Sequence, residues 1–302
     1  MPSVRPPHHQ LSGYRGTFGV IRPAELDRVP LPPLRMPAWR GARPLKRWRY
    51  VGVYGPDLML CVGSARVGPG RQSFWAVWDR ATRRLRERTR RSGGGVRLGM
   101  DRPGRVLVVD EGIEIDLALE EIDGVETICP VGDGPAGAYT WTRKQGGVRA
   151  YGTVRIEGVV RELDALAIVD DSAGYHARHT AWRWCAGVGR ALDGRPLAWN
   201  LVAGINDPPR DSERSVWIGG VPREVGPAAR FTDDLAAVST GDGVDLAFAS
   251  EAVRERRENL LLVRSEYRQP FGAFAGVLPG PHGERLQLAE GWGVMERHTA
   301  LW

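Results

Sequence analysis

Residues 178–182 read Arg-His-Thr-Ala-Trp, and residues 297–302 read Arg-His-Thr-Ala-Leu-Trp. A glycine precedes each arginine by four positions, at Gly174 and Gly293. Four further pairs of similar segments occur in the same order along the chain: 48–53 with 182–188, 60–63 with 201–204, 73–75 with 215–217, and 112–119 with 241–248. Such ordered matches are typical of internal duplication. The sequence therefore predicts two copies of one folding unit.

The repeat also sets the expected domain boundaries. The first copy spans residues 45–181 and the second spans residues 182–302. Residues 1–44 lie outside the repeat and are rich in proline and arginine, so we expect an extended N-terminal arm across the body. Because no Ser- or Pro-rich linker separates the copies, we expect them to pack against each other.

Short apolar or alternating runs dominate both copies, as in residues 58–66 and 113–119, and turns rich in Gly, Pro and Asp separate them. Many short strands at close spacing predict an all-β fold. With the repeat, we expect a tandem duplication of two lipocalin-like antiparallel β-barrels or sandwiches packed together. Residues 250–259 are compatible with a helical turn, and residues 82–90 with a helical turn or an extended edge.

The basic residues exceed the acidic ones by six, and residues 80–91 contain seven arginines and one glutamate. Such a run can contact phosphates, or it can protect an exposed strand edge from pairing with other sheets. No nucleic-acid motif or aromatic platform accompanies the run. We therefore favour an exposed edge and expect no nucleic-acid partner.

Three cysteines, Cys61, Cys129 and Cys185, have no C-x-x-C spacing, which argues against a disulfide framework or a zinc site. Buried free thiols are expected instead. The sequence also has no histidine-rich metal motif, so we expect neither a metal nor another cofactor. No signal-peptide pattern and no apolar run of about 20 residues occur, so a cytoplasmic protein without stable membrane insertion is expected.

Positions that are polar in one copy and apolar in the other are candidates for function. Tyr175 and His176 align with Val294 and Met295, and Asp171 lies just before them. Carboxylate, phenol and imidazole groups are suited to general acid–base catalysis. We therefore take Asp171, Tyr175 and His176 as candidate catalytic residues. A carboxylate in both copies at the position of Asp171 also fits a role in the fold, and a satisfied surface histidine is the alternative for His176.

Candidate ligand-binding residues lie near the start of the second copy. Asn200 replaces Met59 of the first copy and shares a strand face with Asn206. An Asx turn that ends the strand is the structural alternative for residues 206–209. Tryptophans form either core plugs or walls for an apolar or sugar ligand. The four near these asparagines are Trp182, Trp184, Trp199 and Trp217. His179 and His298 match between the copies, as do the arginines before them, so both histidines are assigned to the fold.

Residues 48–63, 171–184, 199–207 and 293–298 resemble a bacterial family of unknown function, characterised by W-R-Y-V-G-V-Y and D-S-A-G-Y-H-x-R-H-T-x-W motifs. The resemblance covers nearly the whole chain after residue 45 and implies family membership without an activity. More distantly, the tandem architecture is similar to the lipocalin-like double-barrel group of carotenoid hydratases and AttH-like proteins. That group includes hydratases and cyclases acting on apolar substrates, although fold-level analogy does not determine chemistry.

Three functions remain open at this point. The first is a cofactor-independent hydratase, isomerase or cyclase that acts on a mostly apolar small molecule in a Trp-lined cavity. The second is a lipid or terpenoid binding protein without catalysis. A carbohydrate-active enzyme is a weaker third possibility, because the carboxylates form no evident pair.

Overall fold

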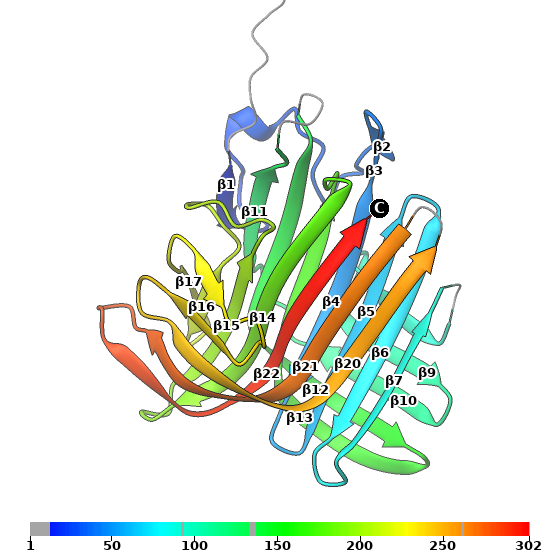
Figure 1. Ribbon diagram of the computed structural model, residues 1–302, viewed down its shortest axis with the longest axis vertical. Helices are drawn as coiled ribbons and strands as arrows, with labels where there is room; N and C mark the ends of the chain where they lie inside the picture. The colour runs from blue at the N-terminus through cyan, green and yellow to red at the C-terminus, as the bar shows by residue number, and fades with distance from the viewer. Residues whose placement is uncertain (1–12, 92–93, 133–136, 261–262, 302) are drawn as a thin grey trace, which may run out of the picture.

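The computed structural model describes residues 13–91, 94–132, 137–260 and 263–301 (Figure 1). In these ranges the protein consists of antiparallel strands and one short 3-10 helix, η1 (Ala24–Leu26). No helix in the described part of the chain is long and apolar enough to cross a membrane.

The strands of the described residues form two large sheets with the same internal order. The first sheet runs β7 (Arg84–Arg90), β6 (Gly70–Asp79), β5 (Leu58–Val67), β4 (Lys46–Tyr54), β13 (Val159–Gly174), β12 (Tyr139–Ile156), β10 (Ile113–Leu119), β9 (Arg102–Asp110) and β8 (Val96–Gly99). The second runs β17 (Val221–Glu224), β16 (Ser215–Ile218), β15 (Pro196–Ala203), β14 (His179–Ala191), β22 (Arg285–Leu301), β21 (Val263–Pro279), β20 (Asp245–Leu260), β19 (Ala237–Thr240) and β18 (Ala229–Phe231). The first sheet pairs β4 with β13, and the second pairs β14 with β22 in the corresponding place. The expected tandem all-β fold is confirmed.

Each sheet rolls over on itself, and the two rolls pack face to face. Strand β8 contacts β5 and β6 across the first roll, and β18 contacts β15 across the second. Along β4, Val51 and Val53 point into the first roll, whereas Tyr50 and Tyr54 point into the layer between the sheets. Successive side chains of a strand alternate between its faces, and here both faces are buried. This explains the nearly continuous apolar run of residues 58–62.

The N-terminal arm covers one end of the first sheet, as Figure 1 shows at the top of the molecule. Its strand β1 (Tyr14–Thr17) pairs with β11 (Val125–Pro130), which also pairs with β12. A small hairpin of β2 (Trp39–Arg40) and β3 (Arg43–Pro44) follows. Leu31 of the arm is buried against the first sheet. Residues 1–12 of the expected arm lie outside the described residues.

The arginine-rich run lies on the edge strand β7. Arg86 pairs with Glu157 at 3.0 Å, and Arg90 pairs with Asp110. Arg80, just before β7, pairs with Glu251 of the second sheet at 2.6 Å. The edge-strand interpretation is confirmed, and these arginines are engaged within the protein.

The helical turn considered for residues 250–259 is wrong. This segment belongs to β20 and pairs with β21 over nearly its full length. A long cross-strand ladder outweighs a weak local preference for helix. The three cysteines, in contrast, are free and buried as expected.

Candidate functional site

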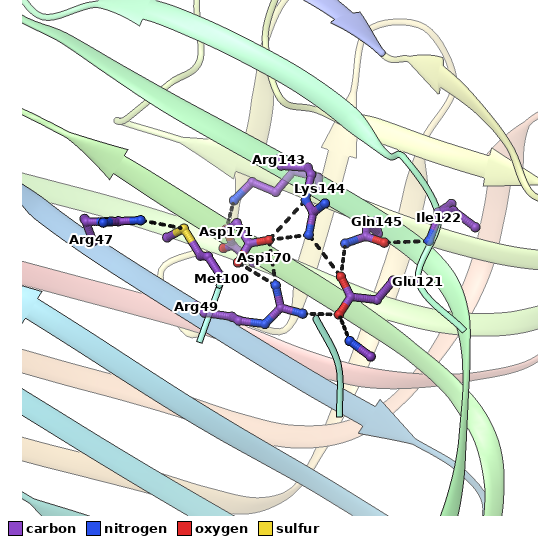
Figure 2. Close-up of polar contacts among 11 residues, drawn as sticks. Arg47, Arg49, Met100, Glu121, Ile122, Arg143, Lys144, Gln145, Asp170 and Asp171 are labelled. Carbon is purple, nitrogen blue, oxygen red and sulfur yellow. Dashed lines mark hydrogen bonds and ion pairs between the residues drawn. The ribbon is translucent and has the colours of Figure 1, made fainter. Parts of the chain in front are cut away.

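Asp171 belongs to a buried charge cluster at one end of the first roll. Arg49 donates to both Asp171 carboxylate oxygens at 2.9 Å, and Arg143 Nη2 donates to Asp171 Oδ2 at 2.9 Å. Glu121 accepts from Arg143 at 3.0 Å and from Gln145 at 2.9 Å (Figure 2). Burial raises the pKa of Asp171, while Arg49 and Arg143 oppose this shift. Because arginines occupy both of its oxygens, the arrangement supports a structural role for Asp171.

Tyr175 holds the N-terminal arm. Its hydroxyl donates to the carbonyl oxygen of Pro37 at 2.8 Å. Its ring meets the edge of the Tyr139 ring at a centroid distance of 5.5 Å, in the same apolar cluster as Leu31 and Met36. Tyr175 is not among the residues that line either cavity described below, and its contacts connect the arm to the first sheet.

His176 lines a cavity of about 540 Å³ between the first sheet and the start of the second, which we call the arm-side cavity. Its lining consists of residues 129–132, Thr140, His176, Ala177, 179–181 and 204–208. The His176 ring packs against Trp48 at a centroid distance of 4.8 Å. Burial, together with the charge of Lys46, lowers the pKa of His176 to about 3. The imidazole is therefore neutral at physiological pH.

Asn200 and Asn206 have different surroundings. Asn200 is fully buried, accepts from Trp184 Nε1 at 2.8 Å and donates to the carbonyl oxygen of Glu213 at 3.0 Å. Such satisfied contacts are those of a structural residue. Asn206 has a left-handed φ of 50° and donates to Glu213 Oε2 at 3.2 Å. It lines both the arm-side cavity and the cavity described next.

The four candidate tryptophans separate into two groups. Trp182 and Trp184 line a cavity between the two sheets. Trp199 lies in the core of the second roll, with its ring 5.1 Å from that of Phe274. Trp217 packs on Gly146 of the first sheet, where an added Cβ would come within 2.3 Å of the indole. Core packing therefore accounts for Trp199 and Trp217.

The cavity between the sheets, which we call the inter-sheet cavity, has a volume of about 440 Å³. Its apolar wall includes Trp48, Tyr50, Phe74, Trp182, Trp184, Val202 and Ile205. Buried Tyr50 and Glu296 lie among its lining residues, and so do exposed Gly70 and Arg71. The cavity therefore reaches from the molecular surface into the layer between the sheets, and its size suits a small ligand.

Glu296 is a carboxylic acid buried in this wall, with 7% of its surface exposed. Trp182 Nε1 donates to Glu296 Oε1 at 2.8 Å, and Gln269 Nε2 donates to Oε2 at 2.9 Å. Burial raises the pKa of Glu296 to about 7, although hydrogen bonds from Trp182 and Tyr267 act in the opposite direction. At neutral pH the acid and carboxylate forms are therefore both populated, which suits a group that donates and accepts protons.

Three further polar side chains surround Glu296 in the cavity wall. Burial raises the pKa of Tyr267 well above its usual value, so the phenol keeps its proton. Burial and the charge of Arg254 lower the pKa of His298 to about 4, and its Nε2 lies 2.8 Å from Ser265 Oγ. The Arg254 guanidinium lies over the Tyr267 ring at 5.0 Å. The site thus combines a titrating carboxyl with a neutral phenol, a neutral imidazole and a fixed cation.

A buried ion triad forms another part of the cavity wall. Lys144 Nζ lies 2.5 Å from Asp170 Oδ1 and 3.2 Å from Glu213 Oε1. Burial alone would lower the pKa of Lys144, but the two carboxylates raise it overall. Burial raises the pKa of Glu213, and Lys144 opposes this shift. Lys144 is therefore held in its charged form.

The alignment of the two copies misassigned His298 and did not single out Glu296. In the structure His298 lies on β22 and His179 lies on β14, so the two do not occupy equivalent places. In the first copy the chain leaves β13 at Gly174 before the shared motif, whereas β22 continues through that motif. Strand register instead places Asp170 opposite Tyr50 and Glu296 opposite Trp184. The sequence does contain a signal for Glu296, which was not used: a carboxylate directly follows the apolar residues 294–295.

No group of three or more His, Cys, Asp or Glu side chains suited to holding a metal ion occurs among the described residues. A comparison with family models matches residues 97–302, more than half of the chain, to the family described as "Domain of unknown function (DUF2804)". The chain belongs to this family. The match to a family of unknown function confirms the resemblance seen in the sequence. Comparison with curated proteins gives no match.

The solved structures that are similar to this chain include two named proteins. An AttH-type protein from Nitrosomonas europaea has 13% sequence identity and a TM-score of 0.47, with 89% of this chain and 98% of that chain covered. Kievitone hydratase from Nectria haematococca has 12% identity and a TM-score of 0.47, with 83% of this chain and 88% of that chain covered. Neither likeness assigns an activity to this chain.

Proposed function

We propose that this protein is an acid–base enzyme that hydrates, isomerises or cyclises a mostly apolar small molecule in the inter-sheet cavity, without a cofactor. The supporting observation is the Glu296 carboxyl, which is buried against an aromatic wall and has a pKa of about 7. Catalytic acids work best when their pKa is near the operating pH. Trp182 and Trp184 would pack against the substrate, and Asn206 would bind a polar group at its end.

Glu296 would transfer the proton in the reaction. In its acid form it can protonate a double bond or a leaving hydroxyl, and in its carboxylate form it can accept a proton from carbon or from water. The hydrogen bonds from Trp182 and Gln269 fix the orientation of the carboxyl. The apolar wall limits competing water and strengthens the electrostatic effect of Arg254.

Deuterium incorporation tests this proposal before the natural substrate is identified. The protein is incubated in D₂O with linalool, citral or farnesol, and mass spectrometry measures deuterium bound to carbon. We expect incorporation with at least one probe, and we expect Glu296→Gln to slow it by about 10²–10⁴-fold, the usual contribution of a general acid–base group. Glu290→Gln is the matched control, because Glu290 is an exposed carboxylate on the same strand.

Two outcomes would contradict the enzyme proposal. One is equal incorporation by the wild type and by Glu296→Gln, provided that the variant melts as a folded protein. The other is quenching of tryptophan fluorescence by the probes without deuterium incorporation. This result would support the alternative of a lipid or terpenoid binding protein without catalysis.

The rate should also depend on pH in the direction set by Glu296. If proton donation limits the rate, activity should fall about tenfold per unit above pH 7, because the acid form is lost there. The titration can be measured directly from the carboxylic-acid C=O band in infrared difference spectra of wild type minus Glu296→Gln. A titration midpoint near the ordinary glutamate pKa of about 4.3 would show that the cavity does not raise the pKa of Glu296.

A further inference from the structure

Lysine is rare in this chain, and its two occurrences share one location. Of the 42 basic residues, all except Lys46 and Lys144 are arginines. Both lysines are buried, and both line the inter-sheet cavity. Arginine remains charged at every physiological pH, whereas a buried lysine can lose its proton and become a nucleophile. The two lysines are therefore the side chains to test for amine chemistry.

The two lysines have opposite electrostatic surroundings. Asp170 and Glu213 contact Lys144 and raise its pKa, so its amine stays protonated. Burial, together with the charge of Arg43, lowers the pKa of Lys46 to about 7. About half of the Lys46 side chains are thus neutral amines at pH 7, compared with about one in 2,500 for an ordinary lysine.

Lys46 lies where the two cavities approach each other. On β4 it shares a face with Trp48 and Tyr50, which line the inter-sheet cavity. Its Nζ donates to the carbonyl oxygen of Ala177 at 3.5 Å, and Ala177 lines the arm-side cavity beside His176. The His176 ring nitrogens are buried and have no side-chain hydrogen-bond partner among the described residues, while the backbone of Gly174 contacts the ring. The amine is therefore placed between an apolar compartment and an imidazole available for hydrogen bonding.

We propose that Lys46 captures an apolar aldehyde or ketone as a Schiff base in the inter-sheet cavity. The nitrogen lone pair of the neutral amine attacks the carbonyl carbon, and a proton moves from nitrogen to oxygen to give a carbinolamine. The hydroxyl then takes up a proton and leaves as water, so that the amine, the carbonyl compound and one proton give an iminium ion and water. Hydrolysis reverses the step and returns the amine.

The proposal rests on the proposed function for the location of the substrate, and it names a substrate class. In an α,β-unsaturated carbonyl compound, the iminium withdraws electrons from the conjugated double bond. Water can then add at the β-carbon while the α-carbon takes up a proton. Glu296 lines the same cavity and has a pKa suited to that proton transfer.

Reductive trapping with citral, an apolar unsaturated aldehyde, tests the capture. The full-length protein is incubated with citral and sodium cyanoborohydride at pH 7, and peptide mass spectrometry locates the adduct. Lys144 is the internal control, since it lines the same cavity in its charged form. We expect one saturable adduct on Lys46, with labelling about a hundredfold or more above that of Lys144. In denaturant, where both amines have ordinary pKa values, the two lysines should be labelled alike.

Two controls separate specific capture from simple amine reactivity. Glyceraldehyde, a polar aldehyde, should label Lys46 at least about tenfold less than citral, because the aromatic wall favours apolar compounds. Lys46→Arg keeps the charge and should abolish the adduct, and Lys46→Met tests the same loss if the arginine variant does not fold. Wild-type protein that shows no Lys46 adduct, equal labelling of both lysines, or equal labelling by both aldehydes overturns the proposal.

The labelling of Lys46 by citral is independent of the deuterium-incorporation test of Glu296. Glu296→Gln leaves the amine in place, so this variant should still form the citral adduct. A failure of capture together with Glu296-dependent deuterium incorporation would refute the Schiff base and leave the acid–base enzyme intact.

Discussion

Asp171→Ala is expected to lower the free energy of unfolding by about 3–5 kcal/mol. The substitution removes a carboxylate that buried Arg49 and partly buried Arg143 both contact and leaves them only Glu121 to share. Removing one partner of a buried ion pair is costly because the remaining charge keeps its desolvation penalty. Urea unfolding followed by circular dichroism measures the free energy of unfolding. The slope of this free energy against urea concentration should be the same in the variant and the wild type, which checks that unfolding remains two-state.

Asp116→Ala is the matched control for this variant. Asp116 pairs with Arg105 at 2.8 Å on the same sheet, but both side chains are at least half exposed. Exposed pairs contribute about 0–1 kcal/mol, so this variant should unfold nearly as the wild type does. Equal stability losses in the two variants would show that Asp171 is not held in a desolvated cluster and would make it available again as a catalytic candidate.

Trp199→Ala is expected to destabilise the protein by about 3–5 kcal/mol without changing ligand affinity. The indole is fully buried in the second roll and packs against Phe274, so its removal leaves a large void. Urea unfolding measures the loss, and fluorescence titration with farnesol, at a temperature where the variant is folded, measures binding.

Trp182→Ala is the comparison for Trp199→Ala. Trp182 is partly exposed and lines the inter-sheet cavity, where its Nε1 contacts Glu296. Its removal should weaken farnesol binding by more than tenfold at a smaller cost in stability. If Trp199→Ala weakens binding as much as Trp182→Ala does, the ligand occupies the second roll and the inter-sheet cavity is not the site.

The candidate site could be predicted from the sequence only in part. Trp182, Trp184 and Asn206 were identified, because tryptophans and polar replacements stand out when two copies of a unit are compared. Tyr175 and Asn200 stood out in the same way, and Asp171 was chosen for its carboxylate close to Tyr175, but hydrogen bonds connect all three residues to the fold. A polar residue specific to one copy marks a local difference, and burial within a closed hydrogen-bond network produces that difference as readily as a ligand does.

The sequence by itself determined the duplication and the strands. These depend on local patterns, namely similar segments such as 48–53 and 182–188, which lie in the corresponding strands β4 and β14, and apolar residues separated by turn signals. Only the tertiary structure decided that Glu296, His298 and Lys46 share one cavity. Their spacing along the chain does not show which strands become neighbours or which face of each strand meets the other sheet. The shifted pKa values of these groups arise from burial between two sheets, and that environment does not exist until both copies have folded and packed together.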